Sequence, residues 1–325
     1  MLPELFTLPI LNRPIFSYGV MLVIGLLVGI EIAKFLARRS GLNPEHFVTA
    51  GILAIAFGIV GARVVHILQN FPEYTRSDLP FWQNLWNAAN VTSGGLVYYG
   101  GVLLATPVLI AYARWKKVPV LLGMDIIAPV LVIALGFGRI GCFLNGCCWG
   151  GACEVEWAPK VSFPYHSPAY QDEVYDPIHP LPVPPELLVE TDDGRSRLKR
   201  PDEVAGHADL RAIASAQHSR ALHPAQLYST ITAWLLGAIL LAYFTLPHAA
   251  GRGFAWMLVL EGFTRFTLEL LRDEPVEFRI FGAGLSFSMG IGLMLCGVGI
   301  VLWFAFGKIA KRGTQCGVQP AASVT

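Results

Sequence analysis

The sequence has 325 residues, of which 54% are hydrophobic and only 14% are charged. Soluble domains usually carry about 25% charged residues, so this composition indicates a polytopic membrane protein rather than a soluble enzyme. The formal net charge is +1, and no basic run has the length or aromatic interleaving that a nucleic-acid-binding protein would need.

Apolar segments long enough to cross a bilayer occur along most of the chain. A window of about 20 residues, the length of a membrane-spanning helix, predicts seven spans at 15–35, 47–68, 94–115, 121–143, 225–246, 254–271 and 281–306. We therefore expect an all-α fold in which residues 1–325 form a single seven-helix membrane domain. No repeat of 20–50 residues is visible.

Basic residues at the ends of these spans predict their orientation. They follow the first, third and seventh spans and lie between the fifth and sixth: Lys34, Arg38, Arg39, Arg114, Lys116, Lys117, Arg252, Lys308, Lys311 and Arg312. All of them fall on one side if the N-terminus is outside, and the positive-inside rule makes that side, with the C-terminus, cytoplasmic. The first residues lack a basic n-region, so we expect no cleaved signal peptide.

Two long connections then fall on the outer side. Residues 70–93 contain Phe81, Trp82 and Trp86, aromatic residues that suit a segment at the membrane interface. Residues 151–222 are the only soluble-like part of the chain. Their composition fits two alternatives equally, a partly ordered loop or a small cap over a site in the membrane.

The fourth predicted span ends in an arginine surrounded by glycines. Arg139 follows the apolar run 128–135, so it lies at or below the edge of the bilayer. A charge there costs roughly 3 to over 10 kcal/mol unless it faces protein, water or an anion. The neighbouring glycines leave room for close approach, namely Gly136, Gly138, Gly141 and Gly146. An embedded cation with cleared space around it indicates a bound anion.

The sixth predicted span carries charges on one helix face, because Glu261, Arg265, Glu269 and Arg272 are spaced by four, four and three residues. Neighbours at this spacing can pair, so one interpretation is a structural ion-pair ladder.

Two further arginines, Arg63 and Arg139, lie in other spans near the same outer face as Arg265. They give a surplus of positive charge in a low dielectric, which favours an anionic ligand. The planar guanidinium fork suits phosphate.

Three other polar features are less specific. His223, Gln226 and Tyr228 open the fifth span from the outer side, and paired glycines flank Tyr98 and Tyr99 at the start of the third. Each set could face a lipid head group or could serve as a helix cap or an aromatic belt. Asp125 opens the fourth span on the inner side, about 21 Å from Arg139 at 1.5 Å per residue, so we expect it to act as a helix N-cap or in a first turn.

Cys142, Cys147, Cys148 and Cys153 fall within twelve residues. Their spacing lacks the paired C-x2-C units of zinc sites, so we predict no metal site. Small buried hydrophobic residues, or one disulfide on the outer side, fit better. A catalytic thiol is a third alternative, although no histidine partner is evident.

These motifs together resemble those of the bacterial prolipoprotein diacylglyceryl transferases, and the resemblance covers all seven spans. The matching residues, in chain order, are Tyr18-Gly19-Val20-Met21, Gly61-Ala62-Arg63, Gly94-Gly95 with Gly100-Gly101, Asp125 with Pro129, Gly138-Arg139-Ile140-Gly141 with Asn145, Gly146 and Gly150, His223-Pro224 with Gln226 and Tyr228, and Arg265 with Glu269 and Arg272.

The resemblance implies an activity and a location. Members of this family transfer the diacylglyceryl group of phosphatidylglycerol to the lipobox cysteine of preprolipoproteins and release glycerol 1-phosphate, which is the first step of bacterial lipoprotein maturation. The implied partners are phosphatidylglycerol, the signal peptide with its lipobox cysteine, and the bilayer, without a cofactor and without nucleic acid. The implied location is the bacterial cytoplasmic membrane, with the active site facing outward.

The implied reaction also assigns roles. The substrate thiol must lose a proton, because the thiolate is the nucleophile, and cations must stabilise the departing phosphate. We expect Arg139 and Arg265 to stabilise the phosphate, and we add Tyr99 and Glu269 to the catalytic set. We expect the remaining residues to bind the lipid or hold Arg265 in place: Tyr18, Arg63, Gly94, Gly95, Gly100, Gly101, Asn145, Gly150, Tyr228 and Arg272.

The sequence departs from the best-known members at four positions. It has Tyr99 where they have histidine, Cys142 where they have asparagine, Cys147 where they have glutamate, and Glu261 where they have tyrosine. A tyrosine hydroxyl is a poor base at neutral pH unless cations activate it. The thiol proton could therefore go to an activated Tyr99 or to Glu269, or the thiol could ionise in the field of the arginines.

A protein of another class would use the same arginines. A transporter or binder of an anionic lipid or solute is the alternative function. It would be expected to have discontinuous helices and internal symmetry, and the sequence indicates neither.

Overall fold

The computed structural model describes residues 4–8, 13–75, 79–90, 95–191, 196–272, 277–280, 283–310 and 315–316. Seven long helices coincide with the predicted spans: α1 Ser17–Arg39, α2 Glu45–Gln69, α5 Tyr98–Trp115, α6 Val120–Asn145, α10 Ala225–Phe244, α11 Arg252–Glu269 and α12 Phe287–Ala310. Five of them, α1, α2, α6, α10 and α12, are long and apolar enough to cross a membrane. The expectation of an all-α membrane protein is confirmed at this level.

The remaining elements are short. The outer segment after α2 holds α3 Phe71–Tyr74 and α4 Phe81–Ala89. The described residues contain four antiparallel strand pairs: β1 Glu4–Leu8 with β2 Arg13–Phe16, β3 Leu188–Glu190 with β4 Ser196–Leu198, β5 His248–Ala249 with β8 Gln315–Cys316, and β6 Phe278–Ile280 with β7 Ala283–Leu285.

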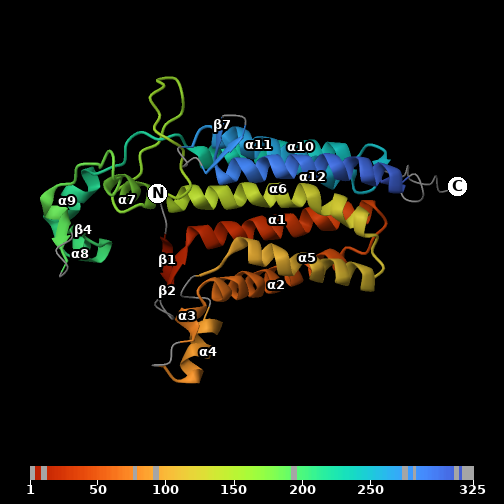
Figure 1. Cartoon of the computed structure of the whole chain (residues 1–325), viewed down its shortest axis with the longest axis horizontal. Coiled ribbons are helices and arrows are strands. Elements are labelled where there is room, and N and C mark those ends of the chain that lie inside the picture. Colours follow the sequence, from red (N-terminus) through yellow and green to blue (C-terminus); the bar gives the residue numbers. More distant parts are fainter. Residues whose placement is uncertain are drawn as a thin grey trace.

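The long helices pack side by side as pairs. Helix α1 lies along α6, α2 along α5, α10 along α6, and α11 along α12 (Figure 1). Glycines allow the closest of these contacts, since a Cβ atom on Gly100 of α5 would lie 2.5 Å from the carbonyl oxygen of Gly61 on α2. Small residues at such contacts are typical of helices that associate within a membrane.

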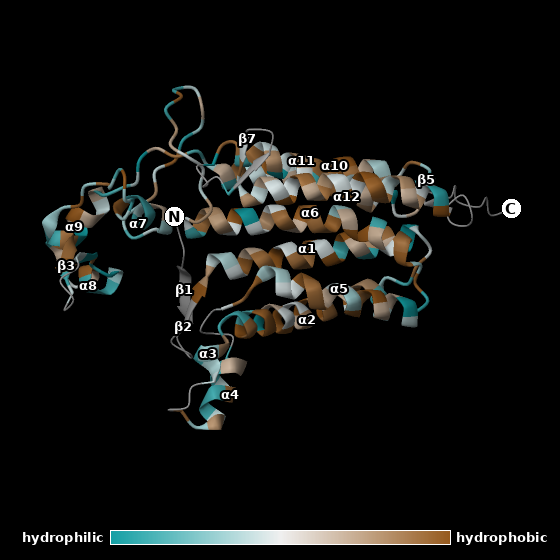
Figure 2. Ribbon diagram, in the orientation of Figure 1, coloured by the Kyte–Doolittle hydropathy of each residue, from teal (hydrophilic) through white to brown (hydrophobic). Residues whose placement is uncertain are grey.

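The two ends of the bundle differ in chemistry. The turns α1–α2, α5–α6 and α10–α11 lie at one end with the C-terminal end of α12 (Figure 1). The basic residues of the sequence analysis that the structure describes belong to these turns and helix ends, whereas Lys311 and Arg312 lie outside the described residues. The pair β1–β2, helices α3 and α4, and residues 151–222 lie at the opposite end. Hydrophobic residues dominate the long helices, whereas α7 and α8 are mainly hydrophilic and α9 is mixed (Figure 2).

Asp125 connects two of the long helices at the basic end. Its buried carboxylate accepts hydrogen bonds from the backbone N–H groups of Gly251, at 2.7 Å, and Phe254, at 3.0 Å. The predicted capping role is therefore present, but the capped helix is α11 and not the helix that carries Asp125. The difference arises because α6 begins at Val120, which places Asp125 in its second turn.

Residues 151–191 and 196–222 form a small unit with α7 Pro168–Val174, the 3-10 helix η2 Pro185–Leu187, α8 Pro201–Ala205 and α9 Ala208–Ala216. Two apolar clusters fill it. Phe163, Ala169 and Leu222 form one, and Leu187, Val204 and Ala214 form the other. The unit, which we call the outer unit, thus has a small core of its own.

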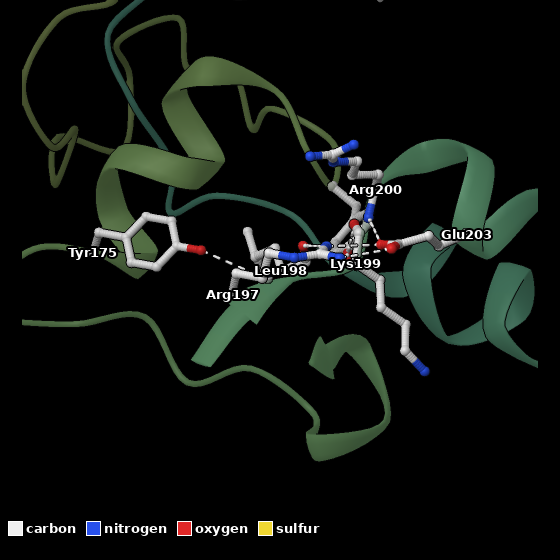
Figure 3. A network of polar contacts seen from close by, with 7 residues as sticks. Tyr175, Arg197, Leu198, Lys199, Arg200 and Glu203 are labelled. Carbon is white, nitrogen blue, oxygen red and sulfur yellow. Dashed lines mark hydrogen bonds and ion pairs between the residues drawn. The ribbon is translucent and has the colours of Figure 1, made fainter. Parts of the chain in front are cut away.

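A polar network joins the strands and helices of the outer unit (Figure 3). The guanidinium of Arg197 on β4 donates two hydrogen bonds to the carboxylate of Glu203 on α8, at 2.7 and 2.8 Å. The backbone N–H of Arg200 donates to the same carboxylate, at 2.6 Å. Tyr175 accepts a hydrogen bond from the backbone N–H of Leu198 at 3.0 Å, so the end of α7 is tied to β4.

Candidate active site

A polar cavity of about 40 Å³ lies between α6, α10 and α11. Its charged lining consists of Arg139 from α6, Glu261, Arg265 and Glu269 from α11, and Arg272 just beyond α11. The uncharged polar lining consists of Cys148, Ser229, Thr232, Thr264 and Ser288. With three arginines and two glutamates, the formal charge of this lining is +1, as the sequence analysis expected of an anion site.

Two of the cavity's arginines lack a carboxylate partner. No ion pair within 4.0 Å involves Arg139 or Arg265 in the part of the chain that the structure describes, and Nε of Arg265 is buried there without a hydrogen-bond partner. A buried donor left unsatisfied is costly. The two guanidinium groups are therefore available to an anion in the cavity.

The third arginine is paired. Arg272 contacts Glu269, with Nη1 at 3.4 Å from Oε2, and Ser286 donates a hydrogen bond of 2.9 Å to the other oxygen of Glu269. Glu269 is only 4% exposed. Along the charged stripe of α11, this is the one ion pair among the described residues, so the stripe does not form the ladder that its spacing permits.

Tyr18 and Asn145 lie at the same end of the bundle but outside the cavity lining. Tyr18, in the first turn of α1, packs against α6 at Gly141, where a Cβ atom would meet the Tyr18 ring at 2.9 Å. Asn145 is the last residue of α6.

A short loop after α6 forms one wall of the site. Gly150 donates its N–H to the carbonyl of His223 at 2.9 Å, and a Cβ atom there would lie 2.9 Å from the carbonyl oxygen of Leu271. Only glycine fits between these two backbones. The buried side chain of Gln226 donates to the carbonyl of Cys147 at 2.8 Å and holds the loop from the side of α10.

The structure places Arg63 elsewhere, at the contact of α2 with the outer segment. It is 5% exposed and donates to the carbonyl oxygens of Asn87 at 2.6 Å, Ala88 at 2.8 Å and Gly95 at 3.1 Å. Gly95 has a φ of +73°, a conformation that glycine adopts without strain. Arg63 thus holds the segment between α2 and α5, and its charge is not directed to the cavity.

Three further predicted glycines have other outcomes. Gly100 and Gly101 pack against Gly61 and Gly58 of α2 and do not line the cavity. Gly94 lies outside the described residues.

Two other candidate tyrosines, Tyr99 and Tyr228, also lie outside the cavity lining. Tyr99, on α5, is 54% exposed, and its ring stacks edge-on with that of Tyr98 at 5.7 Å between centroids. The hydroxyl of Tyr228 donates to the carbonyl of Pro159 at 3.2 Å and lies 3.4 Å from Nδ1 of His223. Tyr228 therefore faces the outer unit.

The four clustered cysteines are free thiols, so the predicted alternative of a disulfide among them is wrong. The Sγ atoms of Cys142, Cys147 and Cys148 all lie within 4.8 Å of one another. Cys153 is buried apart from them, and its thiol donates to the carbonyl of Val155 at 3.8 Å.

Five residues that line the cavity were not predicted from the sequence: Ser229, Thr232, Thr264, Ser288 and Cys148. For three of them the sequence offered a clue. Thr264 directly precedes Arg265, and Ser229 and Thr232 are three residues apart and so share a face of α10. Ser288 had no such signal, because its contribution depends on how α12 packs on α11.

Comparison with known proteins identifies the family of this chain. The model of the family described as prolipoprotein diacylglyceryl transferase matches residues 3–305. The phosphatidylglycerol–prolipoprotein diacylglyceryl transferase of Corynebacterium diphtheriae is 26% identical over 307 residues, which cover 93% of this chain and 90% of the relative. The protein of the same name from Clostridium tetani is 27% identical over 93% of this chain and 97% of its own. The chain therefore belongs to the prolipoprotein diacylglyceryl transferase family.

Proposed function

We propose that this transferase moves the diacylglyceryl group of phosphatidylglycerol to the thiol of a lipobox cysteine in a preprolipoprotein. The thiolate attacks the carbon of the diacylglyceryl unit that bears the phosphate. A carbon–sulfur bond forms at that carbon, and its bond to the phosphate oxygen breaks. Glycerol 1-phosphate leaves with the bonding electron pair, and the product is a thioether. The names of the relatives support these substrates.

One observation carries the proposal. The cavity combines an unpaired Arg139 with an Arg265 whose buried Nε has no hydrogen-bond partner among the described residues. Negative charge grows on the phosphate as it departs, and cations already in place stabilise that charge without reorganisation. Guanidinium groups can each donate two hydrogen bonds to such an anion. We assign Arg139 and Arg265 to the departing phosphate.

Other residues in and around the cavity have roles beside Arg139 and Arg265. Glu269 and Ser286 fix Arg272 at the edge of the cavity, where it adds a third cation. We assign Tyr18 and Asn145, at the outer ends of α1 and α6, to the glycerol head group. Arg63, Gly95, Gly100, Gly101 and Tyr99 support the α2–α5 pair or lie on its surface, and we assign them no chemical role.

The distribution of charge supports an orientation. We propose seven spans, with α5 and α11 crossing the membrane beside the five more apolar helices, the N-terminus outside and the C-terminus in the cytoplasm. The described basic residues at the helix ends belong to the end of the bundle opposite the outer unit, an arrangement of the turns that Figure 1 shows. The site then opens toward the outer face of the bacterial cytoplasmic membrane, and the outer unit acts as a cap beside it.

The test uses the purified full-length protein in vesicles of phosphatidylglycerol with a lipobox peptide. Mass spectrometry should show the peptide heavier by one diacylglyceryl group, and should show no change for a peptide with serine in place of the cysteine. Vesicles of phosphatidylcholine, which lack the leaving group, serve as the second control. An unmodified cysteine peptide in the presence of folded protein would contradict the proposal, and accumulation of bound phosphatidylglycerol alone would favour a lipid-binding protein.

A further inference from the structure

The three-cysteine cluster, formed by Cys142, Cys147 and Cys148, lies at the wall of the polar cavity. Its Sγ atoms are within 4.8 Å of one another and all three residues are partly buried. Cys148 lines the cavity together with Arg139 and Arg265. Cys142 comes from the last turn of α6, and the other two come from the loop that follows.

The backbone is shaped to bring the three thiols together. Gly146 ends α6 with a φ of +73°, and the N–H of Cys147 returns to the carbonyl of Cys142 at 3.0 Å. Cys148 has a φ of +60°, which is strained for a residue with a side chain. Side chains of consecutive residues usually point in different directions. With the left-handed backbone at Cys148, the Sγ atoms of Cys147 and Cys148 nevertheless both lie within 4.8 Å of that of Cys142.

A second element holds this geometry. The side chain of Gln226 on α10 is fully buried and donates its amide N–H to the carbonyl of Cys147 at 2.8 Å. The loop is therefore fixed from α6 and from α10, and the strained residue between them persists. Backbone strain that the surroundings maintain is typical of functional sites.

We propose that Cys142, Cys147 and Cys148 bind a thiophilic divalent cation of the zinc class as thiolates and leave its fourth position open to the cavity. Zinc–sulfur bonds of about 2.3 Å put tetrahedral sulfur atoms about 3.8 Å apart. The thiols, which lie within 4.8 Å of one another, reach this spacing by closing about 1 Å or less. Sites with three protein ligands and one open position are the catalytic kind.

The charges of the cavity suit such a site. Three thiolates around a divalent cation carry a net charge of −1, and their protons are released to water when the metal binds. Arg139 and Arg272 line the same cavity as Cys148 and offset that charge. The sequence did not predict this site, because the spacing C-x4-C-C differs from the paired C-x2-C units of common zinc sites.

The site supplies a route for the proton of the substrate thiol that uses neither of the lining glutamates. The inference that follows rests on the proposed function. None of the described residues that line the cavity is a histidine, and Glu269 already accepts hydrogen bonds from Ser286 and Arg272. A thiol that binds a metal ion loses its proton outright. The substrate cysteine becomes the fourth ligand, and its proton goes to water.

The bound sulfur then uses an electron pair to form the bond to the glycerol carbon, and the phosphate departs toward Arg139 and Arg265 with the electrons of the carbon–oxygen bond. The product sulfur is a thioether, which carries no charge and is a weaker ligand than a thiolate. The product is therefore released and the fourth position reopens.

The experiment uses cobalt as a spectroscopic probe on the reduced, full-length protein under anaerobic conditions. Co²⁺ should bind with about one equivalent per chain and give a sulfur-to-cobalt charge-transfer band together with the visible bands of four-coordinate cobalt. Cys148→Ser should weaken or remove the charge-transfer band. The matched control is Cys296→Ser, since Cys296 lies in α12 and its thiol donates to the carbonyl of Val259; it should keep the full band.

The substrate contact is tested in the same solution. A lipobox peptide should increase the charge-transfer band by adding a fourth thiolate, and its serine analogue should not. Zn²⁺ should displace the cobalt and abolish the band in the wild-type protein, a measurement that requires no variant. Chelator treatment should lower transfer from phosphatidylglycerol at least tenfold, and added Zn²⁺ should restore it.

The outcomes separate the two proposals. Transfer without any cobalt band, or at an unchanged rate after metal removal, would overturn the metal site and leave the transferase activity standing. A cobalt charge-transfer band of undiminished intensity in Cys148→Ser would overturn the ligand assignment. A wild-type band that responds to the peptide while no lipid is transferred would support the site and count against the proposed function.

Discussion

The carboxylate of Asp125 accepts a hydrogen bond of 2.7 Å from the backbone N–H of Gly251, so a residue inside α6 caps the start of α11. The two helices that carry Arg139 and Arg265 are thereby joined at the end of the bundle opposite the cavity. Arg139 lies about 21 Å further along α6, by the rise of an α-helix. A contact far from the cavity thus helps to fix the relative position of Arg139 and Arg265, which have no ion pair among the described residues.

Asp125→Ala should destabilise the protein strongly. The substitution leaves the N–H groups of Gly251 and Phe254 without their acceptor in a buried place, which costs about 1–3 kcal/mol. The helix-capping interaction is lost as well. Thermal unfolding in detergent, followed by circular dichroism, measures the effect. Asp209→Ala, an exposed position of the outer unit, should leave the midpoint unchanged; equal midpoints for both variants would contradict the capping role.

Arg139→Lys should lose most of the transfer activity although the charge is kept. Lysine is a point charge without the planar fork, so it cannot form two parallel hydrogen bonds to the departing phosphate. Removing one preorganised donor of this kind typically costs about 100-fold in kcat. The transfer assay in phosphatidylglycerol vesicles measures the loss. Arg38→Lys at the basic end of the bundle is the matched control, and near-normal turnover of the Arg139 variant in folded protein would exclude phosphate clamping.

Tyr99→Phe should change the transfer rate by no more than about twofold, as for most exposed substitutions. Tyr99 is 54% exposed and does not line the cavity, so we expect its hydroxyl to take no part in the reaction. A pH–rate profile of the variant, compared with the wild type, checks this. A large loss at neutral pH that is recovered near the thiol pKa of about 8.5 would instead identify Tyr99 as the base.

Hydropathy and helical spacing were sufficient to predict the helices and part of the site. The bounds of α2 and α6 differ from the predicted spans by one or two residues at each end, because long apolar runs leave few alternatives. Arg139 and Arg265 were predicted to meet an anion because embedded charges need a partner, and both line the cavity. These predictions depend on local pattern and on the cost of burying charge.

The features that the sequence did not reveal have a different physical cause, because distant backbone groups decide them. Arg63 is satisfied by the carbonyl oxygens of Asn87 and Ala88, whose positions no periodicity predicts. Asp125 caps a helix that begins more than a hundred residues later in the sequence. The three-cysteine cluster depends on a left-handed turn at Cys148, which is rare for cysteine and so has no sequence signal.

The outer unit should lose part of its stability in acid through one ion pair. The hydrogen bonds from Arg197, with that from the backbone of Arg200, lower the pKa of Glu203 to about 2 from its usual 4.5 (Figure 3). A lowered pKa in the folded state means that the contribution is complete above pH 4.5 and is lost as the pH falls toward 2. The pair is partly exposed, so salt should weaken it too.

Hydrogen exchange of the full-length protein measures this effect, with wild type and Glu203→Gln compared at each pH. At pH 7 the variant should exchange faster around β4 and α8, because the amide carries no charge to hold Arg197. The difference should shrink as the pH falls below 4.5, because the wild-type carboxyl also becomes neutral. Glu190→Gln, an exposed position on β3, controls for the loss of a surface charge. A difference between wild type and Glu203→Gln that stays constant down to pH 2 would mean that charge pairing does not stabilise this network.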